Sequence, residues 1–173
     1  MRTLPAAQRT ARIARWAGTA AALTALATAC THAASATATA PNGISAAPGQ
    51  VTVEEPGVSL SITGAVAHLD PSGSGTLSMT VHNGSSVPEH LDMVATPDGG
   101  RGVLTGRAGA PASGSMTSAG ILLEPDSTVT FGKSGPSVRL THLHGVANAH
   151  TLALMLQFGV TGLVHLSAVI PAR

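Results

Sequence analysis

The chain has 173 residues, and its nine Lys and Arg against eight Asp and Glu give a formal net charge of +1 with histidine neutral. Four of the basic residues precede Cys30 and every acidic residue follows it, so the chain after Cys30 holds five basic and eight acidic residues, a net charge of −3. A mildly acidic chain offers no electrostatic attraction to phosphate backbones, which excludes nucleic acid as a partner.

The N-terminal segment has the pattern of a bacterial secretion signal. Four arginines run into an Ala/Leu-rich stretch that is shorter than the roughly 20 residues of a membrane-spanning helix. The stretch ends in small residues before Cys30, the only cysteine of the chain. We expect residues 1–29 to be a lipoprotein signal peptide and Cys30 to carry the lipid on the outer face of the cell membrane. Leu is usual three positions before such a cysteine, and Ala27 stands there, so the alternative is ordinary cleavage near Ala29 and a soluble, secreted protein.

Residues 30–50 are predicted to form a flexible tether. They are mostly Ala, Ser, Thr, Pro and Gly, a composition that buries too little apolar surface to offset the entropy lost on ordering. Residues 51–173 have the size of a single domain. Because Cys30 has no second cysteine to pair with, this domain has no internal disulfide. Its core must be built from Val, Leu, Ile and Ala, with Phe131 and Phe158 as its only aromatic residues.

Short segments of alternating polar and apolar residues, separated by clusters of Gly, Pro, Asn and Ser, predict strands throughout the domain. We therefore expect an all-β fold, a single antiparallel β-sandwich. The Gly/Ala/Ser-rich segment 97–120 is expected to be a long connection with short strand pieces near Val103-Leu104 and Met116. The other predicted strands are Val58–Leu69, Thr76–His82, His90–Ala95, Thr128–Phe131, Val138–His144, Thr151–Phe158 and Leu163–Ile170.

Motifs of catalysis are missing from the sequence. It contains no Gly-x-Ser-x-Gly, no phosphate-binding glycine loop and no His-Glu-x-x-His. We therefore expect that the protein is not an enzyme. What the domain has in excess is His and Met, and these are copper ligands, since a thioether suits Cu(I) and an imidazole suits either copper state.

The sharpest local feature is Thr141-His142-Leu143-His144. Residues two apart in a strand project from the same face, so the imidazoles of His142 and His144 could reach one metal ion. A solvated strand face explains the same pair without a metal.

Met116 is the second candidate, because it lies in a Ser/Gly-rich segment with no apolar residue at strand spacing. The alternative is a methionine held under a loop against the sandwich. Met79 and Met93 each alternate with leucines and are expected to pack in the core, whereas Met155 lies on the face opposite three leucines and is left open. Three histidines that border turns are expected on the surface, namely His68, His82 and His90.

Five segments of the domain follow one another in the order of a known family. Leu77–Gly84 is similar to a strand followed by Asn-x-Gly, and Glu89–Leu91 follows where Asp-Arg-Leu is usual. Leu122–Val129 is similar to Ile-Pro-Ala-Gly-Gly-Thr-Val, Leu143–Val146 to Leu-Met-Gly-Leu, and Leu154–Phe158 to Leu-Thr-Leu-Thr-Phe. Together they resemble the periplasmic PCu(A)C-type copper chaperones. The resemblance implies a cupredoxin-like β-sandwich that binds Cu(I) with His and Met and delivers copper towards the oxidase Cu(A) centre.

The copper motif of that family is a His, a later Met and then His-x-Met, and here the sequence departs from it. When Leu91 is laid on the family's leucine, Thr105 stands at the first His and Met116 at the Met. His142-Leu143-His144 then occupies the His-x-Met region, and alignment on the following Gly-Val instead puts His142 at the last Met. Either way the ligand set is altered. The ligands that the resemblance implies are Met116, His142 and His144, with His90 and Met93 as further candidates.

The leading hypothesis is an exported, lipid-anchored copper-binding protein that receives Cu(I) and passes it by ligand exchange to an exported or membrane partner. By the resemblance, that partner is a copper-accepting protein such as an oxidase assembly factor. Where the family has a methionine, position 144 is a histidine. Its nitrogen is a harder ligand than a thioether sulfur, so the site is expected to tolerate Cu(II) or Zn(II) better than the usual family site. The rival is a metal-free sandwich that serves as a cell-surface binding or assembly module. The copper hypothesis requires Met116 to meet the His142/His144 pair at one end of the sandwich.

Overall fold

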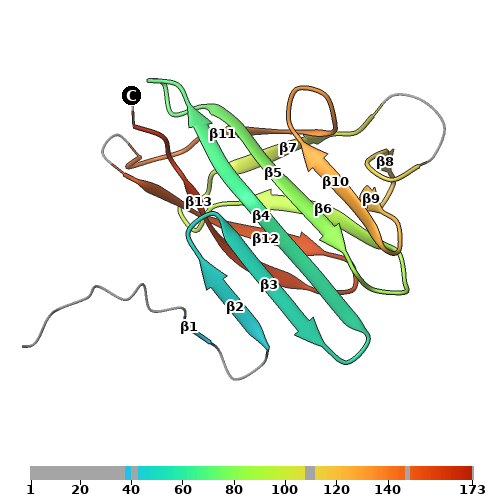
Figure 1. Cartoon of the computed structure of the whole chain (residues 1–173). Coiled ribbons are helices and arrows are strands. Elements are labelled where there is room, and N and C mark those ends of the chain that lie inside the picture. Colours follow the sequence, from blue (N-terminus) through green and yellow to red (C-terminus); the bar gives the residue numbers. More distant parts are fainter. Residues whose placement is uncertain (1–37, 40–42, 108–111, 147–148, 173) are drawn as a thin grey trace, which may run out of the picture. The chain divides into compact units, whose positions relative to one another are not determined.

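The computed structural model describes residues 38–39, 43–107, 112–146 and 149–172, which belong to one compact unit (Figure 1). All the regular secondary structure in these residues is β-strand. In this part of the chain no helix is long and apolar enough to cross a membrane. The predicted signal peptide, residues 1–29, and the predicted lipid-bearing residue, Cys30, lie outside the described residues.

The strands follow one another along the chain with short turns between most of them. In chain order they are β1 (Ala38–Thr39), β2 (Ile44–Ala47), β3 (Gln50–Glu55), β4 (Val58–Leu69), β5 (Gly75–Asn83), β6 (Glu89–Ala95), β7 (Arg101–Thr105), β8 (Met116–Thr117), β9 (Gly120–Leu123), β10 (Ser127–Phe131), β11 (Ser137–Thr141), β12 (Thr151–Phe158) and β13 (Leu163–Val169).

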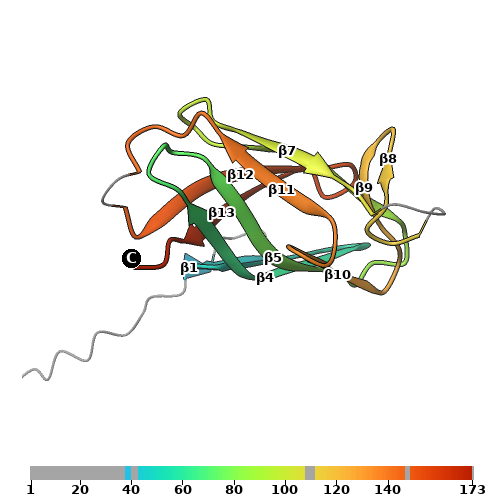
Figure 2. The ribbon, with the colours of Figure 1, turned by 90° about the horizontal axis from the view of Figure 1, so that it is seen from above.

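The strands form two layers that are joined at both edges. One layer contains β3, β4, β5 and β10, and the other runs β13-β12-β6-β7-β11. β11 pairs with both β7 and β5, and β13 pairs with β4 through the single parallel pair Val169 and Val66, whereas the other strand pairs are antiparallel. Figure 2 shows β7 and β12 in one layer above β4 and β10 in the other. The antiparallel, all-β sandwich that the sequence predicts is confirmed.

The core lies between the layers and is filled by aliphatic side chains. Each long strand places alternate residues inward, as β12 does with Leu152, Leu154 and Leu156. Phe131 and Phe158, the two aromatic residues of the domain, are both buried there. The composition of the core is therefore the one that the sequence predicts.

The ordered domain begins earlier than the sequence suggests, because part of the predicted tether, residues 30–50, forms a β-hairpin. Ile44–Ala47 pairs antiparallel with β3, and Pro48-Gly49 makes the turn, with φ of +79° at Gly49. Strand pairing uses backbone groups, so small side chains do not prevent it. Ala38–Thr39 (β1) pairs with the other side of β2. The tether prediction is therefore corrected for residues 38–39 and 44–50.

The connection between β5 and β6 is fixed by a buried amide, Asn83. Its side-chain NH₂ donates to the carbonyls of Val87, Leu123 and Glu124, at 2.9, 3.1 and 3.3 Å, and its Oδ1 accepts from the backbone of Ser85 at 3.0 Å. These bonds tie the loop after β5 to the end of β9.

Asn83→Ala is therefore expected to lower the free energy of unfolding by about 2 kcal/mol, because buried carbonyls lose their donor. Chemical denaturation followed by circular dichroism measures the change. Ser86→Ala, at an exposed neighbouring position, is the matched control. Equal stability of the two variants would contradict this role for Asn83.

Candidate functional site

Met116 lies on the short edge strand β8 with 51% of its surface exposed. It is not held under a loop against the sandwich, so that alternative is wrong. Its backbone lies against Gly106, the residue after the end of β7, where an added Cβ would overlap the Met116 main chain. The residues paired next to this point on β7 and β11 are Thr105 and Ser137. Thr105, at which the family resemblance would place an imidazole, directly precedes Gly106 in the chain, and it carries a hydroxyl group instead.

His142 and His144 lie beyond the end of a strand, which corrects the prediction that β11 continues to residue 144. β11 ends at Thr141, His142 has a φ of +58°, and the backbone N–H of Leu143 donates to the carbonyl of Gly73 at 3.3 Å. The chain leaves the β7–β11 ladder because Leu143 is drawn into the core. Both imidazoles are exposed on either side of this buried residue.

Met116 and the His142/His144 pair do not converge. Met116 is next to Gly106, whereas the carbonyl of His142 is next to Gly100, 3.3 Å from the position of an added Cβ. The two glycines are six positions apart along extended chain, roughly 20 Å at the rise of a strand. Figure 2 shows β8 at one end of the domain and the segment after β11 at the other. One metal ion cannot contact both, so the expected shared site is wrong.

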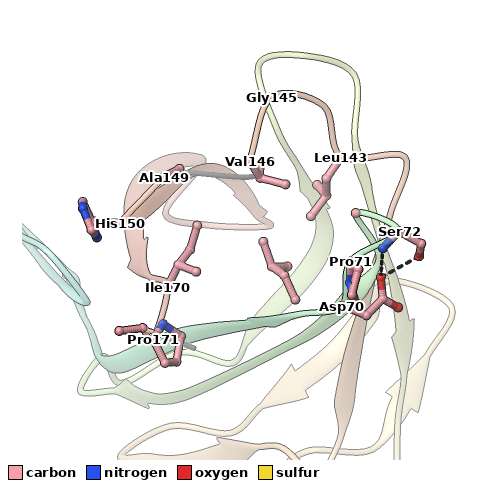
Figure 3. Close-up of a pocket in the computed structure, with 13 residues that line it drawn as sticks. Asp70, Pro71, Ser72, Leu143, Gly145, Val146, Ala149, His150, Ile170 and Pro171 are labelled. Atoms are coloured by element: carbon pink, nitrogen blue, oxygen red, sulfur yellow. Dashed lines mark hydrogen bonds between the residues drawn. The ribbon is translucent and has the colours of Figure 1, made fainter.

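A cavity of about 620 Å³ opens beside the segment that carries the histidine pair. It is lined mainly by apolar side chains, among them Leu143, Val146 and Ile170. Its polar side chains lie on opposite margins: Asp70, which accepts bonds from Ser72, is on one side and His150 is on the other (Figure 3). Its polar groups therefore do not converge on a point where a ligand could be oriented.

The two further candidates of the sequence, His90 and Met93, lie on β6. Met93 is 46% exposed, so the prediction that it packs in the core is wrong. The cause is a β-bulge, since Leu91 pairs with Phe158 and Met93 with Gln157, which leaves Asp92 as an extra residue. The extra residue reverses the alternation, and Met93 projects outward. Met79, by contrast, is buried as expected.

Two residues to which the sequence assigns no role, Met155 and His165, share the outer face of the layer with Met93. They are direct partners in the β12–β13 hairpin. The turn around Val160 could have predicted this pair from the sequence, because a hairpin that reverses there places Met155 opposite His165. The other described histidines are all at least partly exposed, as expected, and no group of three His, Cys, Asp or Glu in the described residues gathers around one point.

Glu89 is a buried carboxylate that fixes the turn between β12 and β13 to β6. It is 3% exposed and accepts bonds from the backbone N–H groups of His90, Val160 and Thr161, and from the Thr161 hydroxyl. Burial alone would raise the pKa of Glu89, but these hydrogen bonds outweigh it and hold the pKa below its usual value. The carboxylate therefore has a structural role.

Comparisons with known proteins find structures with the same fold but no match by sequence. No model of a protein family matches the sequence, and neither does any curated protein. Among solved structures, the copper-bound PCuAC domain from PmoF2 has a TM-score of 0.53 and 21% sequence identity, covering 70% of this chain and 98% of that one.

Two metal-free structures are similar to the same degree. The apo PCuAC domain from PmoF2 has a TM-score of 0.52 and 24% identity, covering 65% of this chain and 90% of that one. The apo PCuAC domain from PmoF1 has a TM-score of 0.51 and 23% identity, covering 70% and 99%. The described domain is thus a cupredoxin-like β-sandwich with the fold of PCuAC domains.

Proposed function

We propose that this chain is an exported copper-binding domain that holds its cargo at the exposed imidazoles of His142 and His144. The observation that carries the proposal is this histidine pair, presented on the fold of a domain whose solved structure contains copper. Met116 is not part of the same site, because it lies at the other end of β7.

The geometry of the pair suits capture and release. Leu143 is buried between the two histidines and anchors the segment, while both rings remain in solvent. Two imidazoles leave coordination positions open, so a partner's ligands can enter before these two leave. With nitrogen donors in place of sulfur, the pair favours Cu(II), and tolerates Zn(II), more than a thioether site does.

The proposal extends to the location and role of the protein. A signal peptide and an acylated Cys30 would place the domain on the outer face of the cell membrane, within reach of an exported or membrane-bound copper acceptor. A blue-copper electron-transfer centre needs a Cys thiolate, and Cys30 is the only cysteine of the chain. Transfer of copper by ligand exchange is therefore favoured over electron transfer.

The double variant His142→Ala/His144→Ala is expected to bind Cu(II) at least about tenfold more weakly than the unaltered chain. Removal of a residue that only hydrogen-bonds to a metal ligand already lowers metal affinity roughly 10–100-fold, and here the ligands themselves are removed. Equilibrium titration of the full chain with Cu(II), followed by metal analysis, measures the affinity. His68→Gln, an exposed histidine on β4, is the control.

Two outcomes would overturn the proposal. Unchanged Cu(II) affinity in the double variant would remove the histidine pair as ligands. A full chain that binds no copper at all would favour the rival, a metal-free module for binding at the cell surface.

A further inference from the structure

The outer face of the β13-β12-β6 layer carries a second group of soft metal ligands. Met155 and His165 are direct cross-strand partners, and both occupy outward positions of the alternating pattern. Such partners have Cβ atoms about 4.5–5.5 Å apart. One thioether and one imidazole therefore stand side by side on an accessible surface.

Met93 completes the group from the neighbouring strand. It pairs with Gln157, which lies two residues from Met155 on the same face of β12. Met93 and Met155 are thus diagonal neighbours, a relation that places Cα atoms about 7–8 Å apart and within reach of long side chains. The β-bulge at Asp92 is what turns Met93 to this face.

We propose that Met93, Met155 and His165 form a Cu(I) site on this face, separate from the His142/His144 pair. Two thioethers and one imidazole are a soft donor set, which selects Cu(I) over Cu(II) and Zn(II). Methionine side chains are unbranched and adaptable, so they can close on an ion from diagonal positions.

Neighbouring residues leave room for an ion and hold the face in place. The cross-strand partner of Met155 on β6 is Ala95, whose small side chain leaves space above the sheet. Asp92, exposed at the bulge next to Met93, places a carboxylate in this region that attracts cations. Glu89, the first residue of β6, binds the turn after β12 through Val160 and Thr161, which ties the β12–β13 hairpin to β6.

The surface is also partly apolar, since Leu163 is exposed beside Gln157. An apolar docking surface would require only hydrophobic side chains of suitable shape. It would not require sulfur at positions 93 and 155 or an imidazole at 165. Substitution of methionine by leucine therefore separates the two roles, because leucine keeps the hydrophobic surface and removes the ligand.

The test is a titration of the full chain, carrying Cys30→Ser to remove its thiol, with Cu(I) in the presence of a competing chelator and a reductant. Met93→Leu, Met155→Leu and His165→Gln are each expected to weaken Cu(I) binding at least about tenfold. Met116→Leu is the matched control, because Met116 is exposed to a similar degree as Met93, 51% against 46%, and lies outside the group. Circular dichroism checks that each variant is folded.

A second readout follows the methionine methyl groups by nuclear magnetic resonance. Cu(I) is expected to shift the methyl signals of Met93 and Met155 and to leave that of the buried Met79 unchanged. Unmoved signals for Met93 and Met155 would overturn the site, as would an equal loss of affinity in Met116→Leu. Loss of all Cu(I) binding in His142→Ala/His144→Ala would also overturn it, while weaker Cu(II) binding alone in that variant leaves both proposals standing.

Discussion

Phe158→Ala is expected to lower the free energy of unfolding by about 3–5 kcal/mol, the usual cost of removing a buried aromatic ring. Phe158 is fully buried, at 0% exposure, and lies at the end of β12 where the core meets the turn to β13. Its backbone N–H donates to the carbonyl of Gly162 at 2.8 Å, so the chain cannot shift easily to refill the space. The cavity left by the ring would therefore persist.

Circular dichroism during chemical denaturation is the appropriate measurement. The domain has no tyrosine, and the only tryptophan of the chain is Trp16, so intrinsic fluorescence would not report on the core. Phe158→Leu is the control, because it keeps most of the apolar volume and is expected to cost less than about 1.5 kcal/mol. A similar loss in both variants would argue against a cavity as the cause.

Glu89→Gln is expected to lower the free energy of unfolding by about 3 kcal/mol at pH 7, the value of one or two hydrogen bonds to a buried charge. Glutamine keeps the size of the side chain, but its NH₂ group would face backbone N–H groups of Val160 and Thr161. Glu124→Gln, at an exposed carboxylate, is the control and is expected to change stability little. Denaturation of both variants at pH 7 measures the difference.

The same carboxylate predicts a dependence of stability on pH. Because the pKa of Glu89 is lower in the folded protein than in the unfolded chain, the carboxylate stabilises the fold above its unfolded-state pKa of about 4.3. That contribution is lost as the pH falls through the folded-state pKa. The stability advantage of the unaltered chain over Glu89→Gln should therefore shrink in acid, and an advantage that stays constant from pH 7 down to strongly acidic pH would contradict this mechanism.

Alternation of polar and apolar residues was sufficient to predict most strands. β4 has the predicted bounds, Val58–Leu69, and β12 coincides with Thr151–Phe158, because each carries a run of inward aliphatic residues. β2 was missed because Ile44–Ala47 consists mostly of small residues. Such a strand is held by backbone hydrogen bonds, and these leave no mark on composition.

The sequence by itself determined the class of fold, the aliphatic core and which types of metal ligand are available. Those properties depend on side-chain pattern and composition, and both can be taken from the chain without knowing its partners in space. Tertiary structure alone decided which ligands meet. A one-residue bulge turned Met93 outward, the burial of Leu143 ended β11 early, and strand register separated Met116 from His142 along β7. Register depends on pairing between distant strands, so local spacing in the sequence does not specify it.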